Sequence, residues 1–353
     1  MAQNPLHYDY PWTTPDAPLV VSAPMMRITM AKAAVTVSAN GGFGFVAGGF
    51  DLSNLAKDLD EAAELVKSQA LARHDGVLPI GVGFQNWGSD LKLALAAITE
   101  HPVAAVWFFA PNQLSDLLDW TNKIRAATNG KTKIWIQIGT VAEAVEVAKT
   151  SRPDVIVVQG ADSGGHGLAQ RASLLTLLPE IADALFKDGI TTPLIAAGGI
   201  VDGRGAAAAL SLGASGVALG TRFLASNEVI IAKGYQNEVL RVADGGVTTV
   251  ATTVYDTVRA IYGWPQAYTG RGVSNRSYLD AVHGMSEGEN QELYKEAMKQ
   301  GDAGWGPEGR MTTYAGTGIG LIHAVQPVGE IVRSVQREAK QVLQKTAARF
   351  AKQ

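Results

Sequence analysis

The sequence predicts an α/β protein whose main domain is a closed (β/α)8 TIM barrel, followed by an additional, mostly helical substrate or cap domain. Three observations lead to this fold class. Eight short apolar runs alternate with alanine-rich segments between Leu19 and Phe223. The runs are apolar on both faces, as parallel strands covered by crossover helices are. Glycines follow several of the runs, the late ones especially, whereas the alternative, a doubly wound open sheet, usually has one glycine-rich phosphate loop after its first strand.

The predicted strands and helices alternate along this part of the chain. The strands are PLVVSA (18–23), GFGFVA (42–47), VLPIGVGF (77–84), VAAVWFFA (103–110), KIWIQIG (133–139), DVIVVQG (154–160), PLIAAGG (193–199) and GVALGT (216–221). Between them, apolar residues recur at helical spacing. The predicted helices are Leu52–Ala72, Asp90–Glu100, Leu114–Thr128, Val141–Lys149, Leu174–Phe186 and Gly203–Leu212.

The alternation stops after Phe223, and the pattern from about residue 228 to residue 300 is mostly helical, with charged and aromatic residues. A last helix, Ile331–Arg349, is rich in Lys, Glu and Gln. We therefore predict a barrel in residues 1–226, a helical substrate or cap domain in residues 227–310, and a C-terminal segment, residues 311–353, that returns to the barrel.

Composition narrows the possible functions. Thirty basic and thirty-three acidic side chains give a formal charge of −3, so no net field draws the protein to nucleic acid or to an anionic membrane. The chain has no cysteine, which excludes disulfides, thiolate metal sites and cysteine nucleophiles. Any redox chemistry must therefore come from a bound cofactor, and the expected ligand is a small molecule. The sequence has neither a secretory signal pattern nor eighteen consecutive apolar residues, which predicts a cytoplasmic protein.

Active sites of such barrels lie at the C-terminal ends of the strands. The first predicted strand ends in Ala23-Pro24-Met25. Pro24 lacks an N–H and suits a strand end, and the small Ala23 lets another group approach the backbone. The soft thioether of Met25 would suit a flat aromatic cofactor, although a methionine that fills the barrel mouth explains it equally well.

Gln137 interrupts the otherwise apolar fifth strand, two residues before its end. Its amide needs hydrogen-bond partners, which either a neighbouring backbone or a ring with polar edges supplies. We favour a ligand-facing side chain because the position is so near the strand end. Gln85, at the end of the third strand, is a weaker candidate of the same kind.

The sixth strand leads into GADSGGHG, residues 160–167. Glycines such as Gly165 permit a close approach of the backbone to a ligand, so the loop suits a flat group with one imidazole, His166, directed across it. A neutral imidazole near pH 7 accepts a proton from a carbon acid. The alternative is a flexible surface turn with a solvated histidine. The position at a barrel strand end favours the functional interpretation.

The seventh and eighth strands end in a pair of glycine-containing loops. Loops at these two places form the usual phosphate site of the fold, and Gly198, Gly199, Gly220 and Thr221 fit that role. We interpret Asp202 as the N-cap of the next helix, with Arg204 as its ion-pair neighbour. The paired loops predict a phosphorylated ligand, most economically a cofactor.

Three blocks of sequence together resemble the nitronate monooxygenase family, formerly called 2-nitropropane dioxygenases. They are APM after the first strand, VVQGADSGGHG after the sixth, and IAAGGIVDGRGAAAALSLGASGVALGTRFLAS across the seventh and eighth. The later segments TTVYDTVRAIYGWPQAYTGR and YAGTGIGLIHAVQPVGEIV also resemble that family. The resemblance implies FMN on a barrel with an added substrate domain, and no metal.

The resemblance also implies roles for single residues. His166 would be the base that deprotonates a nitroalkane. Met25, Gln137, Gly165, Gly198, Gly199, Gly220 and Thr221 would surround the flavin and its phosphate. The expected reaction is the oxidation of a small alkyl nitronate by O2 to a carbonyl compound and nitrite.

Two departures and two other functions stay open. This chain has Asp162-Ser163 where many relatives have Glu-Ala, and Gly83 where many have asparagine; Gln85 and Asn86 are the candidates to replace that asparagine here. Relatives include flavin-dependent enoyl reductases, which need a reduced nicotinamide donor. A flavin-free phosphate-binding lyase or isomerase would be favoured by a lysine at a strand end, but Lys133 precedes its strand core.

Overall fold

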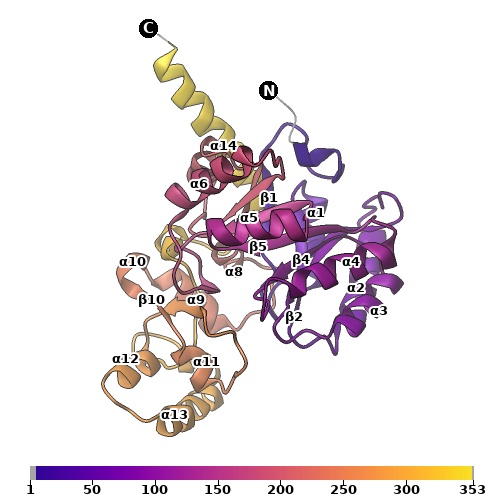
Figure 1. Ribbon diagram of the computed structural model, residues 1–353. Helices are drawn as coiled ribbons and strands as arrows, with labels where there is room; N and C mark the ends of the chain where they lie inside the picture. The colour runs from indigo at the N-terminus through magenta and orange to yellow at the C-terminus, as the bar shows by residue number, and fades with distance from the viewer. Residues whose placement is uncertain (1–4, 352–353) are drawn as a thin grey trace.

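A computed structural model describes residues 5–351 and contains the predicted barrel (Figure 1). Residues 1–4, part of the segment in which no secretory signal was found, lie outside the described residues. The barrel strands are β1 (Leu19–Ser22), β2 (Phe43–Gly49), β3 (Leu78–Gln85), β4 (Val103–Phe109), β5 (Lys133–Ile138), β6 (Val155–Gln159), β8 (Leu194–Ala197) and β9 (Gly216–Leu219). Each strand pairs in parallel with the next, and β9 closes the barrel on β1. All eight predicted strands are confirmed.

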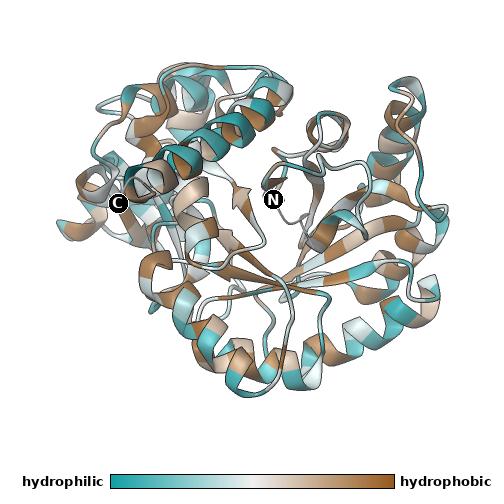
Figure 2. Cartoon of the chain, turned by 90° about the horizontal axis from the view of Figure 1, so that it is seen from above, coloured by the Kyte–Doolittle hydropathy of each residue, from teal (hydrophilic) through white to brown (hydrophobic). Residues whose placement is uncertain are grey.

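Helices separate the strands and cover the outside of the barrel, with their apolar faces toward the strands (Figure 2). They are α1 (Ala31–Ala39), α2 (Leu55–Ser68), α3 (Leu91–Glu100), α4 (Asp116–Thr128), α5 (Val141–Thr150), α6 (Leu174–Lys187) and α7 (Gly203–Ser211). Helix α1 was not predicted. Six of its nine residues are buried, so its sequence lacks a polar face from which to recognise it.

Aromatic side chains fill the barrel interior. Phe43, Phe45, Trp107 and Trp135 are buried there, and Tyr10 from the N-terminal segment packs against them. The indole of Trp135 donates a hydrogen bond of 2.7 Å to the Tyr10 hydroxyl. Burial of that hydroxyl raises its pKa. The barrel therefore has a packed core, which leaves room for a ligand only toward the C-terminal ends of its strands.

The second part of the chain is mostly helical but also contains a small sheet (Figure 1). The elements after the last barrel strand are α8 (Thr221–Leu224), which still belongs to the barrel, and then α9 (Lys233–Arg241), α10 (Gly245–Thr248), β10 (Thr249–Thr252), α11 (Val254–Val258), β11 (Tyr268–Val273), α12 (Arg276–Val282) and α13 (Glu287–Lys299). Short 3-10 helices lie at Pro5–His7, Gly301–Gly304 and Thr317–Leu321. We call residues 227–310 the cap; these domain boundaries stay predictions.

The small sheet joins the cap to the barrel. Its strand order is β10–β11–β7, and β7 (Gly165–Leu168) belongs to the loop after barrel strand β6. In the antiparallel register of β7 and β11, His166 lies opposite Gly270. The sequence did not predict this sheet, because its strands are short and glycine-containing. Because β7 pairs with β11, residues of the cap hold the loop that contains His166 in place.

The last helix, α14 (Val328–Phe350), packs against α7 and α1 on the outside of the barrel. Its carboxylate Glu338 accepts a hydrogen bond of 2.8 Å from the N–H of Gly203, at the start of α7. A Cβ atom at Gly203 would overlap Glu338, which explains the glycine. Among the helices of the described residues, none has the length and apolarity that a membrane span requires.

Candidate active site

A cavity lies at the C-terminal end of the barrel, and most of the predicted site residues form its wall. The predicted residues that line it are Ala23, Gln137, Gly198, Gly199, Gly220 and Thr221. Pro24, Met25, Gly165 and His166 adjoin this set in the chain but are not among its lining residues. Trp107, Gln159, Ser163, Gly164, Gly316 and Gly318 also line it and were not predicted. The role of each residue toward a cofactor stays a prediction.

Glycine occupies the cavity wall for two different reasons. Gly198 and Gly199 have φ values of +106° and +74°, which side-chain-bearing residues rarely adopt. A Cβ at Gly198 would also lie 2.9 Å from the carbonyl oxygen of Gly160. At Gly220, in contrast, the nearest described atoms are Ala23 Cβ and Met25 Sδ, both 3.8 Å from a built Cβ. The fold itself does not require glycine at 220, so the space left there is available to a ligand.

A segment from beyond the cap closes the cavity on one side. Gly316 donates its N–H to the hydroxyl of Thr221 at 3.0 Å. Thr317 donates its hydroxyl to the Asp162 carboxylate at 2.9 Å and its N–H to the Asp162 carbonyl at 3.0 Å. The glycines of YAGTGIG could have marked this segment as part of the site. Their spacing, however, does not predict that the segment contacts the loop after β6.

The departures from the family pattern have structural explanations. Asp162 holds Thr317, and the hydroxyl of its neighbour Ser163 accepts a hydrogen bond of 2.7 Å from Arg171. A Cβ at Gly83 would overlap the ring of Pro24, so Pro24 packs on β3 and an asparagine at 83 does not fit.

The suggested replacements for that asparagine are only partly engaged. The side-chain oxygen of Asn86 accepts the N–H of Phe109 at 2.9 Å, while its amide nitrogen is buried without a partner among the described residues. The side-chain oxygen of Gln85 is likewise buried and unpaired within residues 5–351. The end of β3 thus has hydrogen-bonding capacity that the described residues leave unused.

The partner that the protein supplies to the Gln137 amide is a side chain and not the backbone, and the role of Gln137 toward a ligand stays a prediction. Its side-chain oxygen accepts a hydrogen bond of 3.0 Å from the indole of Trp107, and the residue also lines the cavity. Met25 packs against the barrel core cluster and against the cluster formed with the cap. This supports the interpretation that it fills the barrel mouth.

His166 belongs to a buried network that the sequence did not reveal. Its Nε2 atom lies 2.9 Å from both carboxylate oxygens of Asp256, which is in α11. The hydroxyl of Tyr314 donates to Asp256 Oδ1 at 2.9 Å. The side chains of His166 and Asp256 are each 10% exposed. Burial, and then the charge of Asp256, raises the pKa of Tyr314, so this phenol stays a neutral hydrogen-bond donor.

Packing fixes the plane of the imidazole. The ring of Trp264 stacks on that of His166 with 3.7 Å between centroids and 4° between planes. Gln159, a cavity residue, donates its side-chain N–H to the backbone carbonyl of His166 at 3.0 Å. A Cβ at Gly270, on the opposite strand, would lie 2.7 Å from the Tyr314 ring. The histidine is therefore held from the barrel and from the cap.

Asp202 and Arg204 have structural roles, as predicted. The side chain of Asp202 accepts hydrogen bonds from the N–H groups of Arg204 and Gly205 at 2.9 and 3.1 Å, so Asp202 is the N-cap of α7. Arg204 forms an ion pair with it. Lys133, at the start of β5, pairs with Asp9 at 3.3 Å.

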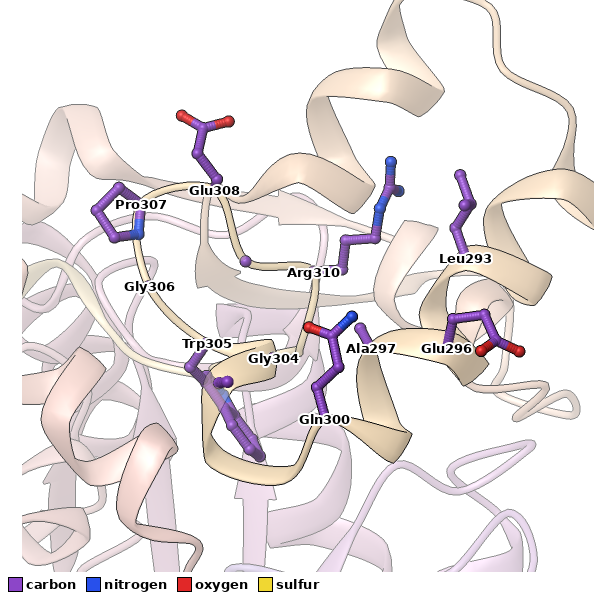
Figure 3. Close-up of a pocket in the computed structure, with 12 residues that line it drawn as sticks. Leu293, Glu296, Ala297, Gln300, Gly304, Trp305, Gly306, Pro307, Glu308 and Arg310 are labelled. Carbon is purple, nitrogen blue, oxygen red and sulfur yellow. The ribbon is translucent and has the colours of Figure 1, made fainter.

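A second hollow, of about 550 Å³, lies in the cap between α13 and the loop after it (Figure 3). It shares no lining residue with the barrel cavity among the described residues. Its cation, Arg310, is already paired with Asp280. We therefore take the barrel cavity and the His166 network as the candidate site.

The fold and the site define a barrel enzyme with its chemistry at the C-terminal ends of the strands. A family model described as nitronate monooxygenase matches residues 94–338. "Nitronate monooxygenase npaC" of Metarhizium robertsii is 48% identical over 343 residues, covering 96% of this chain and 95% of that protein. "Nitronate monooxygenase" of Neurospora crassa is 35% identical and covers 94% of this chain and 91% of its own. The chain therefore belongs to the nitronate monooxygenase family and is a flavin-dependent oxidoreductase.

Solved structures support the fold. FabK from Thermotoga maritima covers 98% of both chains with a TM-score of 0.72. Nitroalkane oxidase from Streptomyces ansochromogenes covers 94% of this chain and 98% of its own, also with a TM-score of 0.72. Both are 22% identical to this chain, so the likeness concerns the arrangement of the barrel and the cap.

Proposed function

We propose that this protein binds FMN and uses O2 to oxidise small alkyl nitronates, or the corresponding nitroalkanes, to a carbonyl compound and nitrite. One observation carries the proposal. A buried histidine, two residues from the cavity residue Gly164 and hydrogen-bonded through its carbonyl to the cavity residue Gln159, lies in a chain that aligns over nearly its full length with relatives named nitronate monooxygenase.

The cavity residues fit FMN. We expect the phosphate to be held by four residues that line the cavity: Gly198, Gly199, Gly220 and Thr221. The space beside Gly220 can accept part of a ligand, because apart from its chain neighbours no described atom lies closer than 3.8 Å to a Cβ built there. Gln137 would offer its amide N–H to the ring, since its oxygen is taken by Trp107. The sequence has one such pair of glycine loops and no dinucleotide fingerprint after a first strand, which favours FMN over FAD.

The flavin supplies the two-electron redox capacity that no side chain of this chain has. The protein's part is to remove a proton and to keep the reacting groups in place. His166 accepts the α-proton of a nitroalkane, which leaves the nitronate. Its burial among Trp264, Tyr314 and Asp256 keeps competing solvent away from the ring.

The experiment tests cofactor and reaction together. The purified protein should have a flavin absorption spectrum, and heat should release FMN, which chromatography separates from FAD. Mixing with ethyl nitronate under air should then consume O2 and form nitrite. Recovery of FAD would contradict the cofactor. Absence of nitrite together with nicotinamide-dependent reduction of a conjugated enoyl compound would contradict the reaction.

A further inference from the structure

We propose that Asp256 is a positioning residue that fixes the tautomer of His166, so that Nδ1, and not Nε2, is the nitrogen that accepts the substrate proton. The inference rests on the proposed function, in which His166 is a base. It adds the partner of that base and the atom at which the proton is held.

The tautomer follows from the contacts of the ring. An ionised carboxylate only accepts hydrogen bonds, and Nε2 lies 2.9 Å from both oxygens of Asp256, so Nε2 must carry the hydrogen. In the neutral imidazole the lone pair is then on Nδ1. Within residues 5–351, Nδ1 makes no hydrogen bond, so the protein leaves that lone pair free.

The carboxylate is itself held in place. Tyr314 donates its hydroxyl to Asp256, and the guanidinium carbon of Arg259 lies 5.6 Å from the centre of the Tyr314 ring. The stacked Trp264 prevents rotation of the imidazole out of its plane. Asp256 is in the cap and His166 is in a barrel loop, so the base is assembled only where the β7–β11 pairing brings the two parts together.

The charge of Asp256 also matters during proton transfer. When Nδ1 gains a proton, the ring becomes an imidazolium, and a carboxylate in contact with the other nitrogen stabilises that cation. The charged and titratable groups that pack at the ring are Asp256, from α11, and Tyr314, from the segment before Thr317, with Arg259, at the end of α11, over the Tyr314 ring. Asp256 is the one in direct contact with the imidazole.

The first test reads the tautomer directly. Long-range 15N–1H spectra of the histidine-labelled holoenzyme should place the hydrogen of neutral His166 on Nε2. The His166→Asn variant assigns the signal among the six histidines of the chain. A hydrogen on Nδ1 in the neutral ring would overturn the inference, whatever the substrate proves to be.

The second test compares Asp256→Asn with Glu292→Gln, which removes a carboxylate from the exposed surface of the cap. In Asp256→Asn, kcat/KM for a nitroalkane should fall by roughly 10² to 10⁴, and the acid limb of its pH profile should move to lower pH. Oxidation of the pre-formed nitronate should fall by less than about tenfold, and Glu292→Gln should match the wild type.

The outcomes separate the two proposals. A nitroalkane rate that collapses in His166→Asn but survives in Asp256→Asn would overturn the positioning role and leave the base intact. Unchanged nitroalkane rates in His166→Asn would contradict the proposed function, while the tautomer measurement would still decide the contact. Circular dichroism and flavin content of each variant exclude misfolding, and Asp256→Glu should recover part of the rate if the carboxylate charge is what matters.

Discussion

At His166, two sets of contacts meet at a single side chain. Gln159 holds its backbone from the barrel, while Asp256, Trp264 and Tyr314 surround its ring from segments later in the chain. A histidine that only capped a surface turn would be solvated, and this one is 10% exposed. The low exposure and the contacts of His166 therefore support a role in the reaction for this side chain.

Replacement of His166 by Asn should separate the two halves of the reaction. Asn retains some hydrogen bonding but accepts no proton near neutral pH, so kcat/KM for a nitroalkane should fall by on the order of 10² to 10⁴. A pre-formed nitronate has already lost that proton, and its oxidation should fall much less. The measurement is kcat/KM for both substrate forms, corrected for flavin content. Equal losses on the two forms would show that His166 binds or orients the substrate instead.

The Gly220→Val variant tests the phosphate position. The backbone there has a φ of −106°, which valine adopts, and a built Cβ meets described atoms only at 3.8 Å, so the variant should fold. Its side chain would occupy the space proposed for the phosphate, and flavin retention should fall. The matched variant is Gly213→Ala, outside the cavity, which should lower stability because its φ is +102° and should leave flavin retention unchanged. Full flavin occupancy in folded Gly220→Val would place the phosphate elsewhere.

Helix α7 allows a direct test of the N-cap that the sequence predicted at Asp202. Asp202 caps this helix, and loss of such a cap typically costs about 1 kcal/mol, so Asp202→Ala should lower the free energy of unfolding by about that amount. Urea denaturation measures it, and Asp183→Ala, on the exposed face of α6, is the control. Equal stabilities of the two variants would remove the capping role.

The same carboxylate makes a pH-dependent contribution. Burial of Asp202 opposes its ionisation, but hydrogen bonds from Arg204 and Gly205 outweigh this and lower the pKa below its ordinary value of 3.8. Because the folded-state pKa is depressed, the contribution is present above the unfolded pKa and is lost as the pH falls from about 3.8 through the folded value. The stability difference between wild type and Asp202→Ala should therefore shrink below pH 4.

At the scale of the whole molecule, the cavity joins three parts of the chain: the barrel loops, the loop after β6 and the segment at Gly316–Gly318. A ligand that binds only this folded arrangement stabilises it by about 2.7 kcal/mol at a concentration of 100 times its Kd. FMN should raise the Tm of flavin-depleted protein by on the order of 5 °C. Riboflavin, which lacks the phosphate, should raise it less at equal concentration. Equal shifts in a thermal scan would contradict the phosphate site.

Local sequence patterns were enough to predict the barrel and many of the residues that line its cavity. Local patterns carry that information: apolar runs specify the strands, helical spacing specifies most of the helices, and Asp202 two residues before Arg204 marks a cap. The glycine loops at 198–199 and 220–221 fell at adjacent strand ends because the parallel order of a barrel puts them there. Helix α1 was not predicted because most of its residues are buried, so its sequence does not alternate between an apolar and a polar face.

The contacts that hold His166 could not be predicted before the fold was known. Asp256 lies 90 residues from His166 in the chain, and Tyr314 lies 58 residues from Asp256. No periodicity or motif links positions so far apart, because contacts of this kind depend on how the cap docks on the barrel. The pairing of β7 with β11 brings them together, since it places Gly270 opposite His166 and leaves the space that the Tyr314 ring occupies.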